Sequence, residues 1–194
     1  AVRSYLLRKK SGPDSEYGAG QIRALEGIEG IRTRPAMYIG DTTLRGLHHL
    51  VYEVVDNSID EAVNGHASVI IVRINADGSV SITDDGRGIP IGIHPKFKNK
   101  TALEVIMTML HSGGKFSGKA YQTSGGLHGV GASVVNALSD HMRVEVARNR
   151  ELYVQEFSRG IPQGPVAKVG PAPNRRGTST TFHADEQIFG SLRF

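Results

Sequence analysis

The sequence has 194 residues, of which 39% are hydrophobic and 22% charged, and its formal net charge is +4 at pH 7. These values predict one ordinary globular domain with a hydrophobic core. The absence of cysteine excludes a disulfide framework and a thiolate metal site, and the longest apolar runs are too short to span a membrane. We therefore expect a cytoplasmic protein with no membrane partner.

The predicted elements begin after an N-terminal segment, residues 1–20, that is rich in glycine, serine and charge and is expected to be a flexible arm. Apolar residues spaced by three predict a short helix over residues 21–34, which Pro35 ends. A longer helix is predicted over residues 47–65. Its apolar stripe comprises Val51, Val54, Val55, Ile59 and Ala62, and its polar stripe comprises Glu53, Asn57, Asp60 and Asn64.

The remaining elements predict a sheet with helices packed on one face. Residues 68–85 are typical of a β-hairpin with Asp77 and Gly78 in the turn. Further helices are predicted over residues 101–112 and 132–139. Alternating patterns predict strands over residues 142–148, 151–158, 165–170 and 177–184. This order indicates an α+β fold, with the helices layered on one face of a mostly antiparallel sheet.

The glycine-rich stretch SGGLHGVG, residues 124–131, directly precedes one of these helices. It is not a P-loop, because the near match that starts at Gly113 has Ala120 where a Ser or Thr should ligate Mg²⁺, and no strand is predicted before it. It is not a dinucleotide fingerprint either, since no βαβ unit surrounds it. Freed backbone N–H groups and a helix N-terminus suit a phosphate chain, but a flexible surface loop has the same composition.

Two further positions have both a functional and an ordinary interpretation. Asp84 lies on the apolar face of its predicted strand, where a carboxylate needs a partner, so it could accept from an exocyclic amine such as that of adenine. It could equally cap the turn that follows. Glu53 and Asn57, one helical turn apart, could act as a general base and an Mg²⁺ ligand, or could simply be solvated.

Several blocks occur together in the order found in the GHKL ATPases, among them EVVDNSIDEA, DDGRGIP, GGLHGVGASVVNALS and GTSTTF. With RTRPAMYIGDT and LEVIMTMLHSGGKF, the chain closely resembles the N-terminal ATPase domains of the B subunits of DNA gyrase. The B subunits of topoisomerase IV are nearly as similar. The resemblance implies the GHKL (Bergerat) ATP-binding fold over residues 21–194, with residues 1–20 as a dimerisation arm.

The resemblance also implies roles for individual residues. Glu53 would activate the attacking water and His49 would orient it, while Asn57 would complete the coordination of Mg²⁺. Asp84 would accept from the adenine amino group, with Thr178 assisting through a water.

Other implied contacts surround these residues. The remaining ATP-binding residues would be Gly88, Ile89, Pro90 and Ile106 at the adenine; Lys115, Leu127, His128, Gly129, Val130 and Gly131 at the phosphates; Tyr121 from a lid; and Tyr17 from the arm. Glu61 and Arg87 would pair at the mouth of the pocket, and Arg148 matches a position that contacts aminocoumarin inhibitors.

The resemblance implies ATP-dependent dimerisation with a second B subunit, assembly with the gyrase A subunit into an A2B2 complex, and DNA strand passage with negative supercoiling. Decatenation by a topoisomerase IV is the alternative. The family's catalytic lysine belongs to a transducer domain that this sequence lacks, so we expect slow hydrolysis and a monomer or weak dimer.

Two other classes of protein fit the sequence less well. A kinase or regulatory nucleotide-binding module is disfavoured by the RPAMYIG and GGLHGVG blocks. A DNA-binding module is suggested only by the basic pI of about 9.4. Because the lysines and arginines are scattered along the sequence, we expect little DNA affinity from this domain alone.

Overall fold

The structure is a computed structural model of the chain, and it describes residues 27–110 and 131–194. The predicted arm and the glycine-rich segment up to Val130 lie outside the described residues. No helix in the described ranges is long and apolar enough to cross a membrane.

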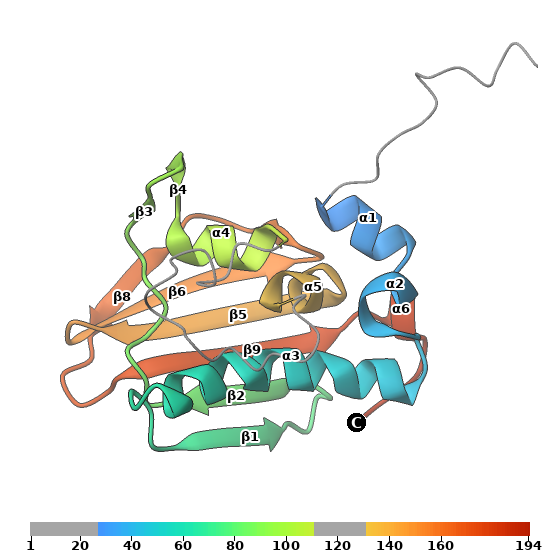
Figure 1. Cartoon of the computed structure of the whole chain (residues 1–194), viewed down its shortest axis with the longest axis horizontal. Coiled ribbons are helices and arrows are strands. Elements are labelled where there is room, and N and C mark those ends of the chain that lie inside the picture. The colour runs from blue at the N-terminus through green and yellow to red at the C-terminus, as the bar shows by residue number, and fades with distance from the viewer. Residues whose placement is uncertain (1–26, 111–130) are drawn as a thin grey trace, which may run out of the picture.

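A seven-stranded sheet forms the centre of the fold (Figure 1). Its strands follow the order β1-β2-β9-β5-β6-β7, with β8 pairing with β6, and every pairing in the described part is antiparallel. The strands are β1 (Ile70–Ile74), β2 (Val80–Asp84), β5 (Ser139–Arg148), β6 (Glu151–Ser158), β7 (Ile161–Pro162), β8 (Ala167–Pro171) and β9 (Gly177–Ala184). The predicted hairpin and four C-terminal strands are thereby confirmed.

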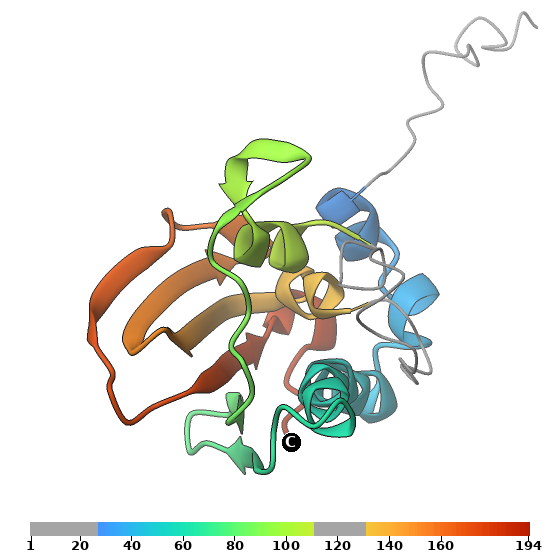
Figure 2. The ribbon, with the colours of Figure 1, turned by 60° about the vertical axis from the view of Figure 1, so that its left-hand side comes forward.

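Helices cover one face of this sheet, as Figure 2 shows for α3, α4 and α5. The helices are α1 (Gly27–Thr33), α2 (Ala36–Ile39), α3 (Leu44–Val63), α4 (Ala102–Thr108), α5 (Ala132–Ala137) and α6 (Glu186–Phe189). A separate hairpin, β3 (Ile93–His94) with β4 (Phe97–Thr101), projects beyond α4. The α+β layering agrees with the prediction, while α2, α6, β3 and β7 are too short to produce a periodic signal in the sequence.

The helix α3 differs from its prediction in the side that it buries. Ile59 was expected in the apolar stripe, yet its side chain is 42% exposed, whereas Glu53 is only 4% exposed. The side that faces the sheet runs through Leu47, Leu50 and Val54 to Ser58. The reason is that α3 passes from the apolar core onto a polar cavity, so its buried side contains both kinds of residue.

Asp185 joins three elements at one end of the fold. Its carboxylate is 1% exposed and lies 2.9 Å from Arg32 Nη1 of α1 and 2.7 Å from Arg159 Nε, which follows β6. It also accepts a 3.0 Å hydrogen bond from the backbone N–H of Gln187 in the first turn of α6. Burial alone raises the pKa of the Asp185 carboxyl, but hydrogen bonds from Arg159, Gln187 and Arg32 outweigh it and hold the pKa below its ordinary value.

We expect Asp185→Asn to lower the free energy of unfolding by about 3 kcal/mol at neutral pH, because it leaves two arginines without their buried partner. The folded-state pKa lies below the unfolded value, so the ionised carboxylate stabilises the fold above that unfolded value, and this contribution is lost as the pH falls through the folded pKa. Urea unfolding of the wild type and of Asp185→Asn should therefore give a difference in the free energy of unfolding that narrows below about pH 4. Glu156→Gln, which alters an exposed pair with Arg143, is the control and should change stability by less than about 1 kcal/mol.

Candidate active site

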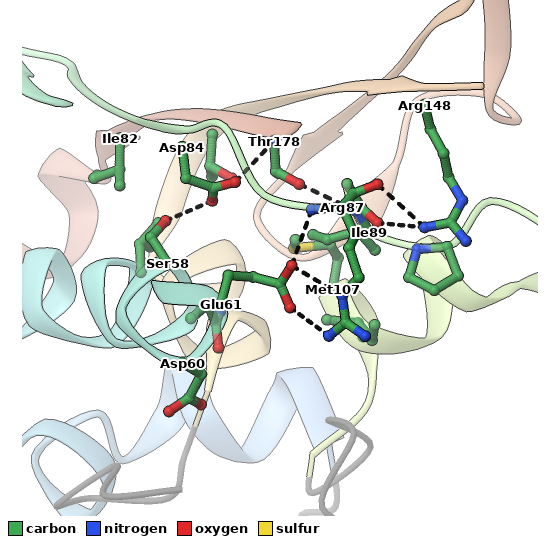
Figure 3. Close-up of a pocket in the computed structure, with 16 residues that line it drawn as sticks. Ser58, Asp60, Glu61, Ile82, Asp84, Arg87, Ile89, Met107, Arg148 and Thr178 are labelled. Carbon is green, nitrogen blue, oxygen red and sulfur yellow. Dashed lines mark hydrogen bonds and ion pairs between the residues drawn. The ribbon is translucent and has the colours of Figure 1, made fainter. Parts of the chain in front are cut away.

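A cavity of about 390 Å³ lies between α3, β2, β9 and the segment that follows β2 (Figure 3). Predicted site residues that line it are Asn57, Glu61, Asp84, Arg87, Gly88, Ile89, Pro90, Ile106, Arg148 and Thr178. These residues come from segments far apart in the sequence. The fold therefore gathers into one cavity most of the predicted residues that it describes.

Asp84 is the polar centre of the cavity. It ends β2 on the side of Val80 and Ile82, as predicted, and its side chain is only 8% exposed. Oδ2 accepts from Ser58 Oγ at 2.7 Å, while Oδ1 accepts from the backbone N–H groups of Gly86 at 2.9 Å and Thr178 at 3.3 Å. A carboxylate offers about four acceptor positions, so one remains for a donor inside the cavity.

Both interpretations of Asp84 from the sequence are therefore compatible with its geometry. The bond from Gly86 is the turn cap, and the same carboxylate lines the cavity with one acceptor position left. Three donors directed at one carboxylate hold it in a fixed orientation. A ligand can therefore donate to it without first having to order the Asp84 side chain.

The start of β9 packs directly against this carboxylate. Gly177 has a φ of +112°, and a Cβ there would overlap the carbonyl oxygen of Asp84. The next residue, Thr178, donates its N–H to Asp84 and accepts the N–H of Ile89 on Oγ1 at 3.1 Å. Glycine at the head of GTSTTF thus allows β9 to approach, and Thr178 then links Asp84 to the wall formed by Ile89.

An ion pair lies at the rim of the cavity, between Glu61 and Arg87, as the resemblance implies. Glu61 Oε1 accepts from Arg87 Nη2 at 2.6 Å, and Oε2 accepts from Nε at 3.2 Å and from the backbone N–H at 3.0 Å. Arg148 Nη1 donates to the carbonyls of Gly88 at 2.8 Å and Arg87 at 3.2 Å (Figure 3). These bonds hold the 87–88 backbone in place against the cavity.

Glu53 and His49 form a second polar group on α3. Glu53 Oε1 lies 3.0 Å from His49 Nε2, and Oε2 accepts the N–H of Gly131 at 3.0 Å. Gly131 has a φ of +75° and precedes α5, so the end of the glycine-rich segment is tied to Glu53. A buried carboxylate held by two partners has a fixed direction, as a general base requires.

The other predicted residues are Tyr17, Lys115, Tyr121, Leu127, His128, Gly129 and Val130, and all of them lie outside the described residues. Conversely, the prediction missed several cavity residues, namely Val54, Ser58, Asp60, Ile82, Met107 and Thr180. Ser58 could have been found, because it continues the helical spacing of Leu47, Leu50 and Val54.

Ser58→Ala should weaken by roughly tenfold the binding of the adenine nucleotide that the resemblance implies, since a hydrogen bond to a charged group contributes about 1.5–3 kcal/mol and part of it is recovered by relaxation. The hydroxyl orients Asp84 without touching the ligand in this scheme. Calorimetric titration measures the change, and Ser81→Ala, on the opposite face of β2, is the matched control. Equal affinity of Ser58→Ala and wild type would show that Asp84 does not need this bond.

The comparisons with known proteins identify the family of the chain. A profile of the family described as histidine kinase-, DNA gyrase B- and HSP90-like ATPases matches residues 42–188. The chain therefore belongs to this family of ATPases, and the family and fold predicted from the sequence are confirmed.

Relatives similar in sequence are the B subunits of DNA topoisomerase 4 and of DNA gyrase. The chain is 61% identical over 177 residues to the B subunit of DNA topoisomerase 4 from Bartonella bacilliformis, which is 91% of this chain and 26% of that protein. It is 56% identical over 185 residues to the B subunit of DNA gyrase from Haloferax volcanii, covering 93% of this chain and 29% of that protein. The chain thus spans less than a third of these relatives.

A solved structure is also similar. It is the 43K ATPase domain of Thermus thermophilus gyrase B in complex with an aminocoumarin, with a TM-score of 0.75 and 47% sequence identity. The similarity covers 89% of this chain and 43% of the other.

Proposed function

We propose that this chain is the ATP-binding and ATP-hydrolysing module of a type IIA topoisomerase B subunit, of the DNA gyrase or the topoisomerase IV kind. The observation that carries the proposal is the buried carboxylate of Asp84, which lines the cavity and keeps one acceptor position that no described residue fills. Relatives of both kinds are more than half identical to the chain, which supports the common activity.

The cavity suits an adenine ring in size and chemistry. Ligand sites commonly measure about 300–1,000 Å³ and combine apolar walls with few polar groups. Here Ile82, Ile89, Ile106 and Met107 supply walls for a flat ring, and Asp84 would accept its exocyclic amine. Guanine presents a carbonyl oxygen at the same place, and two facing acceptors repel each other. Adenine selectivity follows from this contrast.

Magnesium fits the site as a companion of the triphosphate. The described residues contain no cluster of three or more His, Asp or Glu side chains that could hold a metal by itself. Asn57 lines the cavity, and its amide oxygen is a suitable Mg²⁺ ligand. Because Mg²⁺ usually keeps several waters and binds substrate phosphates, one protein ligand is sufficient. The bound ion would neutralise charge on the phosphates.

Hydrolysis would use Glu53 as the base for water and His49 to keep its carboxylate in position. Gly131, whose N–H binds the other oxygen of Glu53, places the beginning of α5 beside this base. In phosphoryl transfer the protein contributes mainly positioning and electrostatic stabilisation. Lys115, Tyr121 and residues 127–131 would surround the phosphates, as the resemblance implies.

We further propose the partners that the family resemblance implies. These are a second B subunit that dimerises through residues 1–20, the gyrase A subunit or its counterpart, and DNA, in the cytoplasm. Arg148 at the rim, together with the aminocoumarin bound to the Thermus relative, supports binding of that inhibitor class.

The test is a calorimetric titration with a non-hydrolysable ATP analogue and Mg²⁺, repeated with EDTA and with the matching GTP analogue. We expect binding of the ATP analogue, weaker binding without Mg²⁺, and little binding of the GTP analogue. Equal binding of the two analogues would contradict adenine recognition by Asp84, and no binding of either would contradict the proposed function.

A further inference from the structure

The β3–β4 hairpin carries three lysines on a projecting ribbon. Lys96 stands in its turn, and Lys98 and Lys100 lie in β4. Figures 1 and 2 both show the hairpin extending beyond α4, away from the sheet. Residues 86–103 contain no Asp or Glu, so no carboxylate of the hairpin itself offsets this charge.

These lysines differ from other cations of the fold in their surroundings. Lys168 lies 3.2 Å from Glu151, and Arg143 and Arg175 likewise lie against glutamates of β5 and β6. Within residues 27–110 and 131–194, none of the three hairpin lysines has an ion-pair partner. Their charge therefore acts outward, into solvent or onto another molecule.

The hairpin presents this charge within a short stretch, residues 96–100. Ile93 pairs with Thr101 and His94 with Phe97, so residues 98–100 of β4 bulge out of the ladder, with Lys98 exposed and Lys100 half-buried. The ring of Phe97 lies 5.2 Å from that of His94 beside the turn. The N–H of Ala102 donates to the carbonyl of Gly92 at 2.8 Å and closes the base of the hairpin. A closed base and a packed turn keep the ribbon in a defined shape.

We infer that the β3–β4 hairpin binds the phosphate backbone of double-stranded DNA through Lys96, Lys98 and Lys100. A single phosphate or nucleotide needs donors that converge, whereas these cations follow one another along a strand, as the charges of a phosphodiester chain do. The choice of DNA rests on the proposed function. The inference departs from the expectation of little DNA affinity, since three of the lysines follow one another within residues 96–100 and the fold places them on one projection.

The affinity should show the salt dependence of a small number of phosphate contacts. For B-DNA the logarithm of the binding constant falls with a slope of about −0.9 per contact against the logarithm of salt concentration. Three contacts therefore predict that binding weakens by roughly 40-fold between about 50 and 200 mM salt. Lysines bind phosphates without reading bases, so sequence preference should be absent.

The experiment measures the fluorescence anisotropy of a short labelled DNA duplex against the 194-residue chain over a series of salt concentrations. The variant Lys96→Gln, Lys98→Gln, Lys100→Gln should bind more weakly, with a slope reduced by about 2.7. The control variant Arg143→Gln, Lys168→Gln, Arg175→Gln removes the same net charge from paired positions and should keep most of the affinity.

Three outcomes would overturn the inference. These are no binding by the wild type at low salt, equal binding by the hairpin variant and the wild type, and equal losses in both triple variants, which would indicate only a long-range effect of net charge. If the hairpin bound an acidic protein and no DNA, the result would be the first of these outcomes, no DNA binding by the wild type. The ATP-analogue titration, run on the same samples, tests the folding of the hairpin variant and the proposed function separately. Analogue binding by the hairpin variant would show that this variant is folded. No analogue binding by the wild type would contradict the proposed function and leave the DNA result to stand by itself.

Discussion

Glu53→Gln is expected to lower the rate of ATP hydrolysis by about 10²–10⁴-fold, the usual contribution of a general base, while nucleotide affinity changes little. Glutamine has the same size, and its carbonyl oxygen can still accept the N–H of Gly131, so the local geometry should persist. Only the ability to take a proton from water is lost. Because slow hydrolysis is expected of this chain, the effect is measured as phosphate release under saturating ATP over long incubations, against a blank without protein.

Two controls make the result specific to Glu53. Glu156→Gln changes an exposed glutamate of β6 and should leave the rate unaltered. His49→Ala should lower the rate by a smaller factor, since His49 only holds the Glu53 carboxylate, at 3.0 Å from its Oε1. An unchanged rate in Glu53→Gln would remove Glu53 from the mechanism and leave the adenine site unaffected.

Asp84→Asn is expected to weaken binding of the ATP analogue by roughly 10–150-fold, the equivalent of one hydrogen bond to a charged group. The amide group has one acceptor oxygen. If that oxygen keeps the bonds from Gly86 and Thr178, the NH₂ group must replace the oxygen that accepts from Ser58. The site then presents a donor where the adenine amine is also a donor.

The neighbouring carboxylate provides a matched control. Asp85 accepts from Val69 N–H, Ser68 Oγ and Ser68 N–H, and these bonds lower its pKa to about 2. Asp85→Asn should therefore lower the free energy of unfolding at neutral pH. This difference from the wild type should be lost as the pH falls toward 2, where Asp85 becomes protonated in the folded protein. Binding of the ATP analogue should be unchanged. Equal loss of binding in both variants would mean that Asp84→Asn acts through folding, which circular dichroism and urea unfolding of each variant would detect.

Much of the site is identifiable from the sequence, because its turn, its strand alternation and its helix spacing are each determined by residues close together in the chain. Asp77 and Gly78 determine a turn, and the alternation that follows places Asp84 on the buried face of β2 by period alone. The spacing of Glu53 and Asn57 on one helix follows from the order of residues, and the ion pair of Glu61 with Arg87, which the resemblance implies, is present.

Tertiary structure decided the features that depend on what each element packs against. Periodicity indicated two stripes on α3 but could not tell that Glu53 is buried and Ile59 exposed, because the burial of each residue depends on what packs against that side of the helix, which for Glu53 includes Gly131 at the start of α5. The close approach of Gly177 to Asp84, and the bond from Ser58 to the same carboxylate, join residues from separate strands and a helix. The sequence by itself determined the local elements and the family of this protein. Only the packed fold determined which polar side chains leave water, since desolvation is a property of the assembled layers.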